Sequence, residues 1–167
     1  MRLFIAVRLS KPVLEQLVLA QKALRRQGAA GNFSREENLH LTLAFLGETE
    51  NTAGAMAAMK RAAGGGAISL TVSGSGRFGS LWWAGIGENP RLSELAETLS
   101  RELCRRGFAM EKRAFRPHIT LARQVTCPRP IRLEIPPRTM TVRSLSLMKS
   151  ERAAGKLVYT ELGRVPL

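Results

Sequence analysis

Residues 38–47 read Asn-Leu-His-Leu-Thr-Leu-Ala-Phe-Leu-Gly, and residues 116–123 read Arg-Pro-His-Ile-Thr-Leu-Ala-Arg. Each stretch holds one of the two histidines of the chain, His40 or His118, with a threonine two places later. Residues two apart point to the same face of a β-strand, so each histidine is predicted to share a strand face with its threonine. The repeat therefore predicts two equivalent strands whose polar pairs gather around one space.

The sequence outside these stretches predicts further strands and helices. Alternating apolar residues at the start indicate a strand, and apolar residues three and four apart after Ser10 indicate a helix that ends at Gly28. Asn89 and Pro90 are typical of a helix start. The expected strands cover residues 3–9, 39–46, 68–73, 81–86, 115–122, 142–148 and 157–162, and the expected helices cover 11–27, 52–63 and 90–106; residues 31–38 are expected as a polar loop, 74–79 as a glycine-containing connection and 127–138 as a connector rich in proline and arginine.

The predicted order is β-α-β-α-β-β-α-β-β-β, and both halves contain a long amphipathic helix followed by a histidine-bearing strand. No linker separates the halves, so residues 1–167 are expected to form one domain. The expected fold class is α+β, with two antiparallel sheets flanked by helices and facing a shared cleft.

The formal net charge of the 167-residue chain is +13, which favours a polyanionic partner or an anionic substrate. No apolar run approaches the roughly 20 residues that span a bilayer. The apolar start is interrupted by Arg8 and Lys11 and lacks the features of a signal peptide. We therefore expect no membrane association and a cytoplasmic location.

The two cysteines, Cys104 and Cys127, lack metal-ligand spacing. Cys104 is expected on the apolar side of a helix, and Cys127 in a loop before Pro128. Neither histidine has a cysteine or carboxylate at metal-ligand spacing, so no metal or other cofactor is predicted.

The residue types of the repeat suit phosphodiester chemistry. An imidazole titrates near neutrality, so one histidine can donate a proton while the other accepts one. The hydroxyls of Thr42 and Thr120 can hydrogen-bond phosphoryl oxygens. The alternative, two core histidines that are merely hydrogen-bonded, does not explain why both lie in the same tetrapeptide pattern.

The paired His-x-Thr motifs resemble those of the 2H phosphoesterases. The longer stretches, together with the opening Arg-Leu-Phe-Ile-Ala-Val at residues 2–7, are similar to the bacterial LigT-like RNA 2′,3′-cyclic phosphodiesterases, also called 2′-5′ RNA ligases. The resemblance implies a bilobal, pseudo-twofold fold of two intertwined lobes with the active-site cleft between them. Phe33 and Glu36 stand where this family often has tryptophan and proline.

The resemblance also implies roles for the motif residues. His40 would protonate the leaving 3′ oxygen, and His118 would take a proton from the attacking water, which leaves a 2′-phosphate. Thr42 and Thr120 would hold the phosphoryl oxygens. The motifs alone do not fix which histidine is the acid and which is the base.

Phe45 and Arg123 each lie five residues after their histidine. In the family, the aromatic residue can stack on the terminal base and the arginine can meet the phosphate. Strict alternation points both side chains away from the histidines, so a strand end or bulge would have to turn them. Arg116 is in phase with His118 and is a further candidate for phosphate contact.

The predicted substrate is RNA with a 2′,3′-cyclic phosphate terminus, and the protein is expected to act as a monomer. 2′-5′ ligation of tRNA halves, which the family resemblance suggests, is an alternative activity. It would have to be independent of ATP, because no nucleotide-binding loop is present. A phosphodiesterase for small cyclic nucleotides is a second alternative, and the high positive charge favours RNA over it. A non-catalytic module that binds RNA ends is a third, but binding alone needs no acid–base pair. The adjacent Trp82 and Trp83 would face opposite ways, so at least one is expected in the core.

Overall fold

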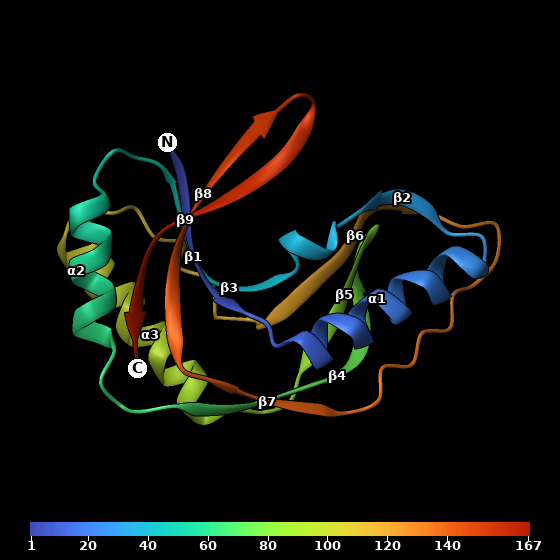
Figure 1. Ribbon diagram of the computed structural model, residues 1–167, viewed down its shortest axis with the longest axis horizontal. Coiled ribbons are helices and arrows are strands. Elements are labelled where there is room, and N and C mark those ends of the chain that lie inside the picture. Colours follow the sequence, from blue (N-terminus) through green and yellow to red (C-terminus); the bar gives the residue numbers. More distant parts are fainter.

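The computed structural model describes residues 1–167 and consists of nine strands and three α-helices (Figure 1). The elements in chain order are β1 (Arg2–Arg8), α1 (Lys11–Arg26), β2 (Ala30–Phe33), the 3₁₀ turn η1 (Glu36–Asn38), β3 (His40–Glu48), α2 (Thr52–Ala62), β4 (Ile68–Phe78), β5 (Leu81–Ile86), α3 (Pro90–Arg105), β6 (His118–Thr126), β7 (Arg138–Val142), β8 (Ser144–Ala153) and β9 (Lys156–Pro166).

The strands form two antiparallel sheets, as the sequence predicts. The first has the order β3-β1-β8-β9, and the second has the order β2-β6-β5-β4-β7. One histidine-bearing strand therefore lies in each sheet, and β3 contacts β6 where the sheets meet. The α+β class with two antiparallel sheets is confirmed.

The helices cover the sheets in an exchanged arrangement. Helix α1 precedes β3 in the chain but packs against β6 and β7 of the second sheet. Helix α3 precedes β6 but packs against β3 of the first sheet, together with α2. Figure 1 shows α2 and α3 at one end of the molecule and α1 toward the other. Each histidine strand is thus flanked by the helix that belongs, in sequence, to the other half.

Local sequence signals fix both long helices. The Ser10 hydroxyl accepts a hydrogen bond from the backbone N–H of Val13 at 3.4 Å, and the Asn89 side chain accepts one from Leu92 at 3.1 Å. These caps satisfy backbone donors that the first turn leaves free. Helix α1 ends before Gly28, whose φ of +94° suits a residue without a Cβ.

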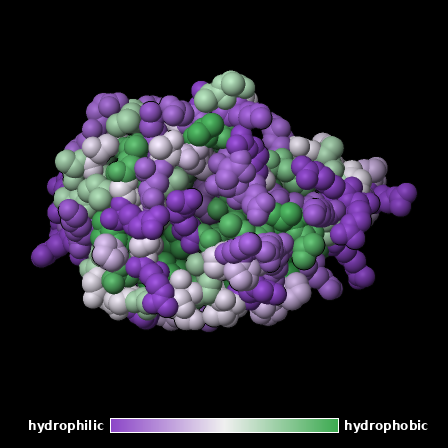
Figure 2. Space-filling view, viewed as in Figure 1, coloured by the Kyte–Doolittle hydropathy of each residue, from purple (hydrophilic) through white to green (hydrophobic).

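The main core fills the space between the helices and the inner faces of the sheets, and it includes Leu17, Leu99 and Ile119. A second, small cluster lies on the other face of the first sheet, where Phe4 and Ala6 pack with Met148 and Tyr159. Figure 2 shows a largely hydrophilic surface with hydrophobic residues gathered in a band across its middle.

Two strands differ from what the sequence predicts. Ala30–Phe33 belongs to a stretch expected largely as polar loop, and Arg138–Val142 begins at the expected end of the connector. β2 and β7 are edge strands, each paired with one neighbour, β6 and β4 respectively. Their pairing partners, rather than their own alternation, make them strands. β4 also continues to Phe78, so the expected 74–79 connection reduces to the turn at Gly79 and Ser80.

The expectation that Cys104 lies on the apolar side of a helix is wrong, because its side chain is exposed. Residues of a helix rotate by about 100° each, so a residue directly after the buried Leu103 lies away from the apolar stripe. Cys127 lies in a loop as expected and is partly buried. None of the three helices combines the length and the hydropathy required to cross a bilayer.

Trp83 lies across a glycine of the neighbouring strand. Gly76 is directly opposite Trp83 in the β4–β5 pair, and a Cβ at Gly76 would overlap the six-membered ring of the indole. Trp82, next to it, packs on the main core, so the expectation of at least one core tryptophan is confirmed. Because Gly76 has no side chain, the indole of Trp83 can lie over it, on the face of the second sheet that is opposite the main core.

Gly76→Ala is expected to lower the free energy of unfolding by about 1–3 kcal/mol, because the added methyl group must displace a packed ring. Chemical denaturation measures this change. Ser69→Ala, at an exposed position of the same strand, is the control and should change stability by less than about 0.5 kcal/mol. Equal effects of the two substitutions would contradict the close packing of Trp83 on Gly76.

Candidate active site

The two histidines are held by the same backbone hydrogen bond. Nδ1 of His40 is 2.7 Å from the carbonyl oxygen of Asn38, and Nδ1 of His118 is 2.7 Å from the carbonyl oxygen of Arg116. A carbonyl only accepts, so Nδ1 carries the hydrogen in both rings. In its neutral form each histidine therefore has an unprotonated Nε2, which can accept a proton and later return it.

His40 lies in an aromatic surrounding on the first sheet. Its ring centroid is 4.9 Å from that of Phe4 and 5.3 Å from that of Tyr159, which meets it edge to face. Its Nε2 is 2.7 Å from the hydroxyl oxygen of Thr42. The predicted pairing of histidine and threonine on one strand face is thus present in β3.

His118 has an equivalent aromatic neighbour on the second sheet. The ring of Phe78 meets it edge to face at a centroid distance of 5.2 Å, and Trp83 lies at 6.5 Å. Phe78 stands at the end of the β4–β5 hairpin, and Tyr159 stands in the β8–β9 hairpin. Each histidine is therefore bordered by an aromatic side chain from a hairpin of its own sheet.

The surroundings of His40 favour its neutral form. Burial is the main cause that lowers its pKa below the ordinary value, and the positive charges of Arg123 and His118 lower it further. The hydrogen bond to Asn38 opposes these effects. Both of these charged groups come from β6 of the second sheet. Burial also raises the pKa of Tyr159, which keeps its hydroxyl protonated.

A β-bulge follows the threonine in both histidine strands. In β3, Thr42 pairs with Ala6 and Ala44 pairs with Ile5, which leaves Leu43 as an extra residue. In β6, Thr120 pairs with Trp83 and Ala122 pairs with Trp82, which leaves Leu121 as the extra residue. A bulge of this kind resets the alternation of side chains along the strand.

The bulges bring the residue five places after each histidine back to the histidine face. Phe45 is 65% exposed, and its ring centroid is 6.5 Å from that of Phe4, which contacts His40. Arg123 is exposed, and its positive charge lowers the pKa of His40 and opposes the rise in the pKa of Tyr159. The bulge that the sequence argument requires for Phe45 and Arg123 is therefore present in each strand.

The remaining residues that the sequence singled out, Arg116 and Phe33, have other contacts. Arg116 is exposed, and its backbone carbonyl holds His118. Phe33 lies under the guanidinium of Arg25 at 4.0 Å from its ring centroid. Sequence reasoning missed Phe4, Phe78 and Tyr159. Only Phe4 had a signal, because it alternates with Leu3 and Ile5 and thus predicts a second apolar face of β1. No group of three or more histidine, cysteine or acidic side chains is placed to hold a metal ion.

Comparison with known proteins agrees with this geometry. A family model described as the 2′-5′ RNA ligase superfamily matches residues 13–154. The chain is 33% identical over 174 residues to the RNA 2′,3′-cyclic phosphodiesterase of Escherichia coli K12, covering 98% of this chain and 94% of that protein. It is 36% identical over 131 residues to the protein of the same name from Thermotoga maritima, covering 74% and 70%.

Solved structures show the same fold. The crystal structure of E. coli LigT complexed with 3′-AMP superposes with a TM-score of 0.81 at 31% identity, covering 99% of this chain and 96% of that one. The crystal structure of TT0787 of Thermus thermophilus gives a TM-score of 0.81 at 30% identity, covering 100% and 98%.

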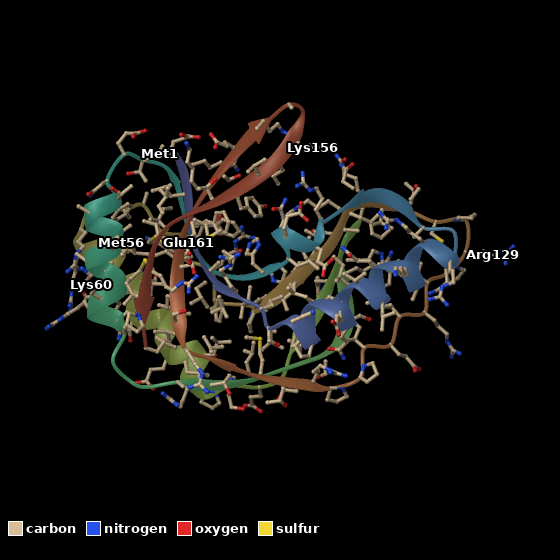
Figure 3. All side chains as sticks on the ribbon, in the orientation of Figure 1. Met1, Met56, Lys60, Arg129, Lys156 and Glu161 are labelled. Carbon is tan, nitrogen blue, oxygen red and sulfur yellow. The ribbon has the colours of Figure 1, made fainter.

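Arg123→Met is expected to raise the pKa of His40, because the substitution removes a positive charge that disfavours the imidazolium form. An NMR titration of the imidazole signals measures the change, and the spectrum of His118→Ala assigns the two histidines. Arg129→Met is the control, since Arg129 lies at the far end of the molecule (Figure 3). The same pKa of His40 in both variants would place Arg123 outside the site.

Proposed function

The chain belongs to the 2′-5′ RNA ligase superfamily, and on this basis we propose a two-histidine mechanism by which it acts as an RNA 2′,3′-cyclic phosphodiesterase. The observation that carries the mechanism is the matched pair of histidines, one from each sheet, with Nδ1 of each bonded to backbone. Such a pair can take a proton from the attacking water and give one to the leaving oxygen of the same phosphate.

In the proposed reaction, water attacks the phosphorus of the cyclic phosphate, and the bond to the 3′ oxygen breaks. His118 takes the proton from the water, and protonated His40 gives a proton to the leaving 3′ oxygen. The product carries a 2′-phosphate and a free 3′-hydroxyl. The two histidines end with exchanged protonation states and recover through solvent.

The role of His40 as the acid follows the family resemblance, while burial favours its neutral form. Nδ1–H of His40 stays bonded to the carbonyl oxygen of Asn38, so Nε2–H is the proton that passes to the leaving 3′ oxygen. The hydroxyl of Thr42, 2.7 Å from Nε2 in the free protein, is then available to donate to a phosphoryl oxygen. A pKa lowered by burial makes protonated His40 a stronger acid, and the anionic substrate offsets the cost of protonating it. Because the acid must be protonated, activity is lost as pH rises through the pKa of His40, so the lowered pKa moves this loss to lower pH.

The remaining predicted residues have roles in binding. Thr42 and Thr120 hold the two non-bridging oxygens of the phosphate. Arg123 is the charged contact to the phosphate, and Phe45, exposed on the same face as His40, stacks on the terminal base. Arg116, which is exposed, is a further contact for the RNA backbone.

We also propose that residues 1–167 act as one catalytic domain of two intertwined lobes. The first sheet supplies His40 and the second supplies His118, while α1 and α3 are exchanged between them. A site completed within one chain fits a monomer. The net charge of +13 fits an RNA substrate, which in turn fits action in the cytoplasm.

The same site supports 2′-5′ ligation as a second activity, in agreement with the name of the superfamily. A 5′-hydroxyl in place of water would attack the same phosphorus and give a 2′-5′ bond, without ATP. Adding an RNA with a free 5′-hydroxyl to the assay separates the two activities by the length of the product.

RNA ending in a 2′,3′-cyclic phosphate is expected to be converted to RNA ending in a 2′-phosphate, with EDTA present. His40→Ala and His118→Ala should each lower the rate by about 10²–10⁴, the usual effect of removing a positioned proton-transfer group. Mass spectrometry of the products and single-turnover rates measure both. Full activity of either variant would disprove the two-histidine mechanism.

The acid and base are assigned by a substrate with a good leaving group. A nucleoside 2′- or 3′-nitrophenyl phosphodiester needs no proton on the departing nitrophenolate, so His40→Ala should lose much less activity on it than on the cyclic phosphate. His118→Ala should lose about as much on both, because the attacking group must still be deprotonated. If the nitrophenyl substrate instead restores His118→Ala, the two roles are reversed.

A further inference from the structure

A buried glutamine of α1 lies against the bulge of β6. Gln21 is 5% exposed and stands in the apolar face of the helix, between Leu17 and Leu24. Its side-chain nitrogen donates two hydrogen bonds, to the carbonyl oxygen of Leu121 at 2.9 Å and to that of Ser34 at 2.7 Å. Leu121 is the extra residue of the bulge, so the amide contacts β6 at the point where its alternation changes.

Ser34 contacts the same piece of backbone from the end of β2. Its N–H donates to the carbonyl oxygen of Leu121 at 2.9 Å, and its hydroxyl donates to that of Thr120 at 3.0 Å. Gln21 thus joins α1, Ser34 and β6 into one hydrogen-bonded unit. A bulge interrupts the regular ladder, and a buried carbonyl there needs donors from elsewhere. Gln21 and Ser34 supply them.

We propose that Gln21 is a positioning residue that holds the β6 bulge and thereby directs Thr120 and Arg123 toward the cyclic phosphate. Without the bulge, strict alternation would turn Arg123 to the opposite face from His118. A polar side chain in the apolar face of α1 is costly unless both of its donors are used, as they are here. The inference rests on the proposed roles of Thr120 and Arg123 in substrate binding.

Gln21→Met tests the proposal, because it keeps the length of the side chain and removes both donors. The ratio kcat/KM for the cyclic phosphate is expected to fall about tenfold, mainly through KM, as for the partial loss of a charge-assisted contact. The pKa of His40 should rise, as in Arg123→Met, because Arg123 is no longer held beside it. Combining Gln21→Met with Arg123→Met should add little to Arg123→Met alone.

Gln27→Met is the matched control, since Gln27 follows the same helix and its side chain donates to Arg132 of the connector instead. It should change neither KM nor the pKa of His40. If Gln21→Met loses stability but matches Gln27→Met in both readouts, Gln21 only packs α1 on the sheet and the proposal is wrong.

Two further measurements keep the test decisive. If Gln21→Met does not fold, Ser34→Ala removes only the bond to Thr120 and should shift KM and the pKa of His40 in the same directions; no shift would overturn the proposal. If Arg123→Met leaves KM unchanged, the proposed role of Arg123 in binding is wrong. The pKa of His40 needs no substrate, so it still decides whether Gln21 positions Arg123.

Discussion

The structure depends on one irregularity, the β-bulge that follows the threonine in each histidine strand. Leu43 and Ala44 are both buried, and so are Leu121 and Ala122, although adjacent residues of a regular strand face opposite sides. Two buried neighbours in a row let the strand fill the core and still return its next side chain to the face that carries the histidine. Each strand thereby presents a third side chain on the same face as its histidine and threonine. This side chain is Phe45 in β3 and Arg123 in β6.

The exchange of helices explains how two sheets form one site. The strands are shared as well: β8 and β9 join β1 and β3 in the first sheet, and β2 joins β6 in the second. Because each helix packs on the opposite sheet, the main core is continuous across both halves. The geometry between β3 and β6, on which any joint action of the histidines depends, is therefore supported by the same burial that stabilises the fold.

The two halves share a pattern but differ in environment. His40 is enclosed by Phe4 and Tyr159, with its Nε2 bonded to Thr42, and burial lowers its pKa. His118 borders Phe78 and Trp83 and is half-buried. The two strands thus share a motif while the surroundings of their histidines differ.

The sequence by itself determined the features that depend on near neighbours in the chain. The caps at Ser10 and Asn89, the strand faces of His40 and His118 and the antiparallel class all follow from short-range spacing. Only the tertiary structure decided what depends on a partner strand or on a distant side chain. β2 and β7 are strands because β6 and β4 pair with them, and Tyr159 reaches His40 because its hairpin bends over β3. The bulges belong to this second group: the repeated Leu-Ala after each threonine is visible in the sequence, but a strand's alternation changes only where its neighbours' hydrogen bonds allow an extra residue.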